Sequence, residues 1–164
     1  MNRILVPFRM HDTGWLLLAL CVLLGIFISG PLLGLAVGAA LVVSLLLHEV
    51  GHMLAAMMLR VPVREFGLCL GGAYNRRAYA GCRQHEILIS AAGPLMNLLL
   101  IVPFFFLPLI GPKVALCNLI LCVVNLLPLT SSDGLRILHQ MRGSKGSAEV
   151  IPVRNQSSST SKAA

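Results

Sequence analysis

The sequence is poor in charge, and poorest in acidic residues. Only 12% of its 164 residues are charged, with 6 Asp or Glu against 13 Lys or Arg. Hydrophobic residues make up 57% of the chain, and its mean hydropathy is +0.85. A soluble domain of this size could not bury so much apolar surface. The composition therefore predicts a protein that crosses the membrane several times.

Other absences narrow the function further. The five cysteines include no C-x-x-C pair, which argues against a structural zinc cluster or a disulfide framework. A net charge of +7 would favour nucleic acid in a soluble protein, but Lys and Arg of membrane proteins collect in cytoplasmic segments. We expect the lipid bilayer as partner and no nucleic acid. No small-residue cleavage site follows the first apolar run, which we interpret as a retained anchor.

Apolar runs separated by Gly-Pro pairs predict an all-α polytopic fold with about four transmembrane helices. The pairs are Gly30-Pro31 and Gly111-Pro112, and proline ends or kinks a helix. One helix across residues 16–47 would be about 48 Å long, more than the hydrocarbon core. We place a transmembrane domain at 14–142, between a lead at 1–13 and a disordered tail at 143–164, with spans at about 14–29, 32–59, 86–110 and 114–135.

Residues 60–85 form the one substantial loop between the expected spans. The segment from Phe66 to Tyr74 alternates like a strand and includes the pair Gly71-Gly72, which predicts a small interfacial β-hairpin-like loop. In a four-span arrangement, all but one of the Lys and Arg residues fall on the side of this loop and the termini. This asymmetry predicts that both termini are cytoplasmic in a multi-pass protein of the cell (inner) membrane.

The most informative stretch is His48-Glu49-Val50-Gly51-His52, in an apolar run without other charge. Histidines four residues apart share one face of a helix and can bind one zinc ion, while the adjacent Glu can reach the metal's water. A carboxylate at membrane depth is costly unless it has a function. The alternative, two core histidines with chance spacing, leaves Glu49 unexplained.

A catalytic zinc takes three protein ligands, so the chain must supply one more. Asp133 is the acid at the end of a membrane span, and Gly134 after it permits a tight backbone. Glu86 begins the third span and is expected at the interface. The remaining histidines near spans, His85 and His139, flank Arg-containing segments and are expected at the solvated surface. The residues therefore favour Asp133 as the third ligand.

Three segments together resemble the site-2 protease family of intramembrane zinc metalloproteases. They cover roughly residues 32–140 and comprise the segment 48–52, Ala92-Gly93-Pro94-Leu95-Met96-Asn97, and Asn125-Leu126-Leu127-Pro128 with Asp133-Gly134. The resemblance implies one zinc ion bound by His48, His52 and Asp133. It also implies that Glu49 is the general base and that Asn97 is an auxiliary residue of the active site. We expect Asn97 to donate a hydrogen bond to the oxyanion or to the substrate backbone.

The resemblance further implies that the 60–85 loop presents a strand edge to an unwound substrate, near Gly71-Gly72. The sequence departs from the family pattern at Thr130-Ser131-Ser132, where apolar residues are usual. We find no PDZ or nucleotide-sensing segment in it, so we expect a minimal core with regulatory partners on separate chains.

The predicted function is a zinc-dependent endopeptidase that cleaves a transmembrane or membrane-tethered protein, as in regulated intramembrane proteolysis. One alternative is a proteolytically inactive relative that binds and escorts membrane proteins, although the three ligand positions and Glu49 are all present. A metal transporter is a further alternative, but the sequence has neither the internal repeats nor the polar path that are usual for transporters.

Overall fold

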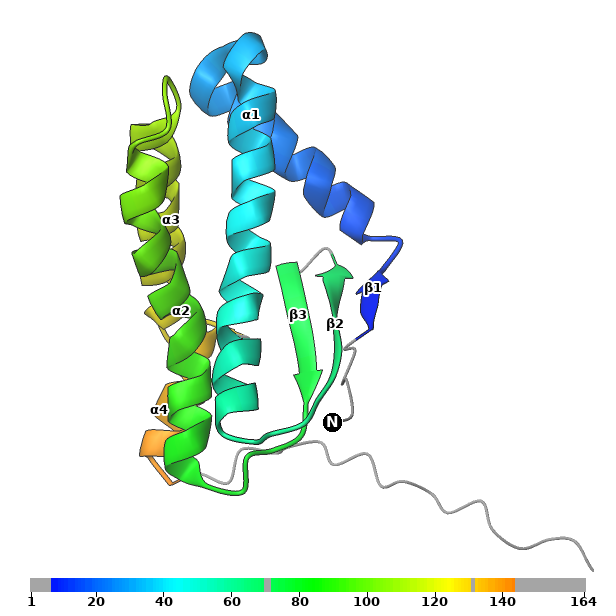
Figure 1. The fold of residues 1–164 in the computed structure, drawn as a ribbon, viewed down its shortest axis with the longest axis vertical. Helices are drawn as coiled ribbons and strands as arrows, with labels where there is room; N and C mark the ends of the chain where they lie inside the picture. Colours follow the sequence, from blue (N-terminus) through cyan, green and yellow to red (C-terminus); the bar gives the residue numbers. More distant parts are fainter. Residues whose placement is uncertain (1–6, 70–71, 131, 144–164) are drawn as a thin grey trace, which may run out of the picture.

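The computed structural model describes residues 7–69, 72–130 and 132–143, and most of them are helical. Gly71, Ser131 and the expected tail from residue 144 onward lie outside the described residues. In chain order the elements are β1 (Phe8–Met10), α1 (Gly14–Met58), β2 (Val63–Cys69), β3 (Gly72–Arg77), α2 (Arg83–Phe105), α3 (Gly111–Leu126) and α4 (Asp133–Met141) (Figure 1).

Helix α1 consists of two helical arms that meet at Gly30. The backbone of Gly30 has φ +75° and ψ 172°, a conformation that suits glycine and strains other residues, and Pro31 follows it. The arms fold back on each other (Figure 1). They touch where glycines remove the side chains, because a Cβ on Gly25 would overlap the carbonyl oxygen of Gly34. The break that we expected at Gly30-Pro31 is therefore present.

Helices α2 and α3 form a second antiparallel pair beside the second arm of α1 (Figure 1). Helix α2 runs through Pro94 and Pro103 without a break and ends at Phe105. Helix α3 ends at Leu126, and α4 starts separately at Asp133. The range 114–135, expected as one span, thus contains the whole of a turn and parts of two helices.

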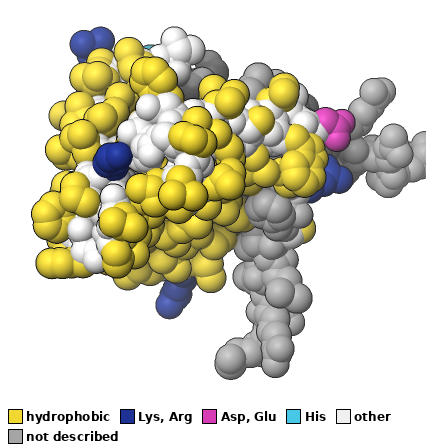
Figure 2. Space-filling model, turned by 90° about the horizontal axis from the view of Figure 1, so that it is seen from above, with side chains coloured by type: hydrophobic (Ala, Val, Ile, Leu, Met, Phe, Trp, Pro, Cys, Tyr) yellow, Lys and Arg dark blue, Asp and Glu magenta, His cyan; other side chains and the backbone are white. Residues whose placement is uncertain are grey.

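The outer surface of the helices is apolar. Helices α1 and α2 are long and apolar enough to cross a membrane, and α3 is a shorter apolar helix. Large side chains such as Phe27, Leu32 and Phe106 are exposed, and hydrophobic atoms dominate the face in Figure 2. Contiguous apolar surface of this extent marks a molecule surrounded by lipid. The all-α membrane fold expected from the sequence is confirmed.

Strands β2 and β3 form the antiparallel hairpin expected within residues 60–85, and β1 adds a third strand. The sheet order is β1-β2-β3, with β1 parallel to β2. Strand β1 was not predicted, because three residues are too few to show a strand period. A small apolar cluster of Ala56, Val61, Val63 and Ile89 joins the sheet to the ends of α1 and α2. The sheet lies beside the second arm of α1 (Figure 1).

Candidate active site

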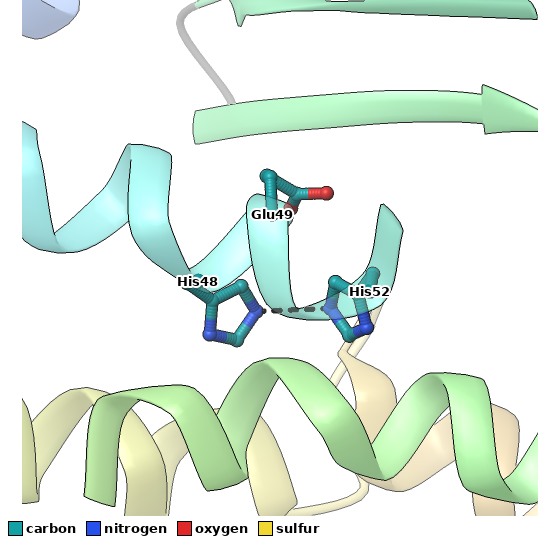
Figure 3. Close-up of side chains that lie close together, drawn as sticks. All are labelled: His48, Glu49 and His52. Atoms are coloured by element: carbon teal, nitrogen blue, oxygen red, sulfur yellow. Dashed lines mark hydrogen bonds between the residues drawn. The ribbon is translucent and has the colours of Figure 1, made fainter. Parts of the chain in front are cut away.

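Two buried imidazoles face α2 from the second arm of α1 (Figure 3). The side chains of His48 and His52 point the same way because four residues complete about one helical turn. Their Nε2 atoms are 3.1 Å apart, and the two residues are 5% and 3% exposed. The helical pairing predicted from the sequence motif is therefore present in the fold.

Asp133, the first residue of α4, brings a carboxylate to the same point. Its Oδ2 lies 3.1 Å from Nε2 of His48 and 3.2 Å from Nε2 of His52. The three atoms thus form a nearly equilateral triangle, which we call the donor triangle. Two ligand atoms of a tetrahedral zinc ion, with bonds of about 2.0–2.1 Å, lie about 3.3 Å apart. Both the donor chemistry and the spacing of the triangle fit zinc.

A backbone carbonyl sets the tautomer of His52. The carbonyl oxygen of Ile89, on α2, lies 2.6 Å from Nδ1 of His52. A carbonyl oxygen only accepts hydrogen bonds, so Nδ1 carries the proton and donates it. The lone pair of the ring is then on Nε2, which faces the donor triangle. This is the arrangement that metal-binding histidines usually show.

Asn97 contacts the imidazole of His48 on the side opposite the donor triangle. Its Nδ2 lies 3.0 Å from Nδ1 of His48, on the side of the ring away from Nε2. The residue is fully buried, and within the described residues its Oδ1 has no hydrogen-bond partner. The sequence motif led us to expect a hydrogen bond from Asn97 to the substrate. The fold instead brings its side chain to a histidine ring.

Glycines let α2 approach the histidines closely. A Cβ on Gly51 of α1 would lie 2.6 Å from the carbonyl oxygen of Ala92. A Cβ on Gly93 would overlap Nε2 of His52 and lie 2.7 Å from Nε2 of His48. The backbone at Gly93 is therefore one wall of the donor triangle. The sequence placed Gly93 in a segment that resembles the family but did not reveal this contact.

A serine hydroxyl shapes the turn that presents Asp133. Ser132 is the N-cap of α4, where its Oγ accepts the N–H of Leu135 at 3.1 Å and lies 2.6 Å from the carbonyl oxygen of Leu127. Gly134 fits because a Cβ there would overlap the carbonyl oxygen of Leu126. Ser132, one of the polar residues where the sequence departs from the family pattern, therefore has a structural role. A serine just before an acidic first turn is a recognisable helix-start signal.

Glu49 lies on a different face of α1 from the histidines. Figure 3 shows its carboxylate pointing toward the strands, while the imidazoles point toward α2. Its Oε2 accepts a hydrogen bond of 2.7 Å from Nδ2 of Asn75 on β3. A carboxylate oxygen of Glu49 lies within 4.8 Å of a ligand nitrogen of each histidine. Glu49 is thus next to the donor triangle without being part of it, and Asn75 is a neighbour that the sequence did not reveal.

Glu86, the other acid considered as a ligand, is occupied elsewhere. Its two oxygens accept hydrogen bonds of 2.9 and 2.7 Å from Nη1 and Nη2 of Arg77, and Oε1 also accepts one from the N–H of Ala80. Both side chains are about 90% buried, at 11% and 10% exposure. The pair connects the end of β3 to the first turn of α2. Glu86 therefore belongs to the attachment of the hairpin and not to the donor triangle.

Known proteins resemble this chain in sequence and in fold. Residues 36–114 match peptidase family M50. A solved structure, the site-2 protease from Methanocaldococcus jannaschii, is similar over 89% of this chain and 71% of its own length, with a TM-score of 0.69 and 25% identity. None of the curated proteins compared with the chain matches it.

The matched family and the shared fold define a class, the membrane metallopeptidases. Within this class, the chain resembles the site-2 protease family, because the solved structure that shares its fold is a site-2 protease. The three sequence segments that resembled the family meet at one point in the fold, where the segment 48–52 lies against Gly93, Asn97 and Asp133.

Proposed function

We propose that the protein is a zinc-dependent endopeptidase that cleaves a transmembrane or membrane-tethered protein within the membrane. The observation that carries the proposal is the donor triangle of His48, His52 and Asp133, buried and with Glu49 beside it. These three residues would hold the zinc ion. When bound, zinc would supply a Lewis acid for the peptide carbonyl and lower the pKa of a water molecule.

Glu49 is the general base in this proposal. Its carboxylate takes a proton from the attacking water as the water oxygen bonds to the peptide carbon. It then delivers the proton to the leaving nitrogen as the C–N bond breaks, so the same residue serves both half-reactions. The support for this role is that Glu49 lies beside the donor triangle and leaves the three corners to other residues.

Asn97 is a positioning residue for His48 in this proposal. If the amide oxygen of Asn97 faces Nδ1 of His48, it accepts the ring N–H and leaves the lone pair on Nε2. This orientation would also give the buried Oδ1 of Asn97 a partner and would match the tautomer of His52. Both imidazoles would then present Nε2 to the metal ion. The role replaces the oxyanion contact that we expected for Asn97.

The hairpin is the proposed docking site of the substrate. A transmembrane helix satisfies its carbonyls internally, so the substrate must unwind locally before a peptide bond becomes accessible. Among the described strands, β3 pairs with β2 on one edge, and its other edge can accept an added strand. Strand β3 begins at Gly72, in the region where docking was expected, and it carries Asn75 toward Glu49.

We also propose that the end with the hairpin is cytoplasmic. The segment between β3 and α2 lies with α4 at the end of the molecule opposite the Gly30 turn (Figure 1). Arg77, Arg83, Arg136 and Arg142 belong to these segments or their borders. Labelling of single-Cys variants with an impermeant reagent tests the orientation. Labelling of a hairpin cysteine from outside intact cells would reverse it.

The experiment that tests the function compares wild type with Glu49→Gln in membranes. The variant retains the shape of the side chain but cannot accept a proton at neutral pH. We expect it to keep its zinc and to capture membrane proteins that the wild type cleaves, with a cleavage rate lower by about 10²- to 10⁴-fold. Equal cleavage by both enzymes would exclude Glu49 as the base.

The same experiment separates the enzyme from the escort alternative. Proteins captured by the Glu49→Gln variant are reconstituted in vesicles with the zinc-loaded wild type. Cleavage of a captured protein supports the endopeptidase. If the wild type binds the same proteins and cleaves none of them, the chain is a binding or escort protein.

A further inference from the structure

Two alternate residues of strand β3, Asn75 and Arg77, reach toward the helices, and each of them binds an acid. Successive residues of a strand point to opposite faces of the sheet. Asn75 reaches Glu49 on α1, and Arg77 reaches Glu86 on α2. Tyr74, the residue before Asn75, points to the other face of the sheet and donates a hydrogen bond of 2.7 Å to Glu65 on β2. The helix-facing side of β3 therefore makes two separate contacts with carboxylates.

The contact with Glu86 fixes the position of the strand. Arg77 and Glu86 form two parallel hydrogen bonds, a geometry that restricts both orientation and distance. The N–H of Ala80 adds a third bond to the same carboxylate. Asn75 lies two residues before Arg77, about 6.6 Å along the strand. The amide of Asn75 is thus presented from a backbone that is attached to α2 at a nearby point.

The contact with Glu49 fixes the orientation of a carboxylate. Glu49 is partly exposed, and its side chain has three rotatable bonds. Within the described part of the chain, Asn75 is the hydrogen-bond donor that meets this carboxylate, at 2.7 Å. A general base works only when it lies within hydrogen-bond reach of the proton that it takes. A donor on a rigid strand restricts the carboxylate to one region beside the donor triangle.

We propose that Asn75 is a positioning residue for Glu49, so that the strand edge proposed to dock the substrate also orients the proposed general base. This inference rests on the proposed function. Asn75 would touch neither the metal ion nor the reacting atoms, and would act through the carboxylate. Substrate recognition and base placement would then depend on the same strand.

If the hydrogen bond between Asn75 and Glu49 only attached the hairpin to the helix, its loss would change kcat and KM in a different way. Loss of a structural attachment would weaken the docking edge and raise KM, or weaken the fold and release zinc. Loss of an orienting contact leaves binding intact and lowers kcat, because fewer bound complexes have the base in place. The two parameters therefore separate the two roles.

The test uses the full chain, loaded with zinc and reconstituted in vesicles with a transmembrane substrate that it cleaves. Asn75→Ala removes the donor, and Asn75→Asp keeps the shape of the side chain but replaces the donor by a second carboxylate. Glu65→Ala is the matched control, because it removes the hydrogen bond between Tyr74 and Glu65, which lies on the opposite face of the sheet. Zinc content, thermal unfolding, kcat and KM are measured for each.

We expect kcat to fall about 10- to 100-fold in Asn75→Ala, and at least as far in Asn75→Asp, with KM within about twofold and zinc content unchanged. The Glu65→Ala control should retain the wild-type kcat. A normal kcat in Asn75→Asp, a loss that appears in KM, or a loss of zinc or of folding in both variants would overturn the proposal.

A double variant separates this inference from the proposed function. In a Glu49→Gln background, Asn75→Ala should cause no further loss, because the carboxylate that it orients is already gone. A further loss equal to that in the wild-type background would mean that Asn75 acts independently of Glu49, which overturns the inference. The inactivity of Glu49→Gln itself tests the proposed function, whatever Asn75 does.

Discussion

The second arm of α1 has two faces with proposed functions, and the fold supports them in different ways. On the histidine face, His48 and His52 are buried against α2, with the backbone of Gly93 as a wall and Asp133 arriving from α4. On the glutamate face, Glu49 is partly exposed and meets one side chain of the hairpin, Asn75. Around the helix axis, Glu49 lies about 100° from His48 and about 60° from His52, since each residue turns the helix by about 100°.

The difference agrees with the roles proposed for the two faces, metal binding and general-base catalysis. Metal ligands have to remain in one geometry, and close packing of helices provides it because packed interiors do not deform continuously. A base has to exchange protons with water and substrate, so it needs access as well as orientation. One hydrogen bond from a strand orients a carboxylate without enclosing it. A substitution on one face should therefore leave the role of the other face intact.

The largest effect is expected from Gly93→Ala, which adds a methyl group to the wall of the donor triangle. The added carbon would overlap Nε2 of His52 and approach Nε2 of His48 to 2.7 Å, so both rings must move. We expect the purified protein to lose most of its zinc, and cleavage to fall by at least about 100-fold. Metal analysis and a cleavage assay measure the two losses.

Leu99→Ala on the same helix is the control for Gly93→Ala, because Leu99 is exposed on the outer surface. It should retain zinc and activity. Full zinc occupancy in Gly93→Ala would show that the histidine face tolerates displacement, and the contrast between the two faces would then disappear.

A smaller effect is expected when the attachment of the hairpin is removed. Arg77→Met leaves the mostly buried carboxylate of Glu86 without its cation, and breaking such a pair costs about 3 kcal/mol of unfolding free energy. Zinc content should persist in the folded protein, because neither residue contacts the donor triangle. Thermal unfolding in detergent measures the loss.

The double variant Arg77→Met/Glu86→Leu checks the reason for that loss. Two apolar side chains leave no unpaired charge, so stability should return most of the way to wild type. If the double variant is as unstable as Arg77→Met, the loss comes from packing and not from a buried charge.

Much of the fold could be predicted because its signals are local. The Gly30-Pro31 break, the apolar runs and the alternating residues of the hairpin each lie within one short stretch of sequence. Strand β1 was missed because its three residues form a strand by pairing with β2, which is distant in the sequence. Helix α4 has a local start signal at Ser132, but the expected span of 114–135 ran through it.

The site residues likewise divide into those that the sequence could predict and those that it could not. The i, i+4 spacing of His48 and His52 predicts their pairing, since helix geometry alone brings them together. The contacts of Asn75 and Gly93 depend on how β3 and α2 pack against α1, and packing leaves no periodic mark in one sequence. Residues that support a site from other elements are therefore the ones that sequence reasoning misses.

The smallest effect is expected at the third corner of the donor triangle, which depends on a helix cap. Ser132 accepts the N–H of Leu135 and ties the turn before Asp133 through the carbonyl of Leu127. Replacing an N-cap serine by alanine costs about 1 kcal/mol. Because the cap orders the backbone that presents the carboxylate, Ser132→Ala should also weaken zinc affinity by about tenfold. Competition with a chelator measures that affinity. Ser132→Thr keeps a hydroxyl that can accept from Leu135 and donate to the carbonyl of Leu127, and it should retain the stability, while Thr130→Ala, at an exposed position of the same turn, should change neither quantity. If Ser132→Ala binds zinc as tightly as wild type, then packing of α4 positions Asp133, and the carboxylate corner is supported in the same way as the histidine face.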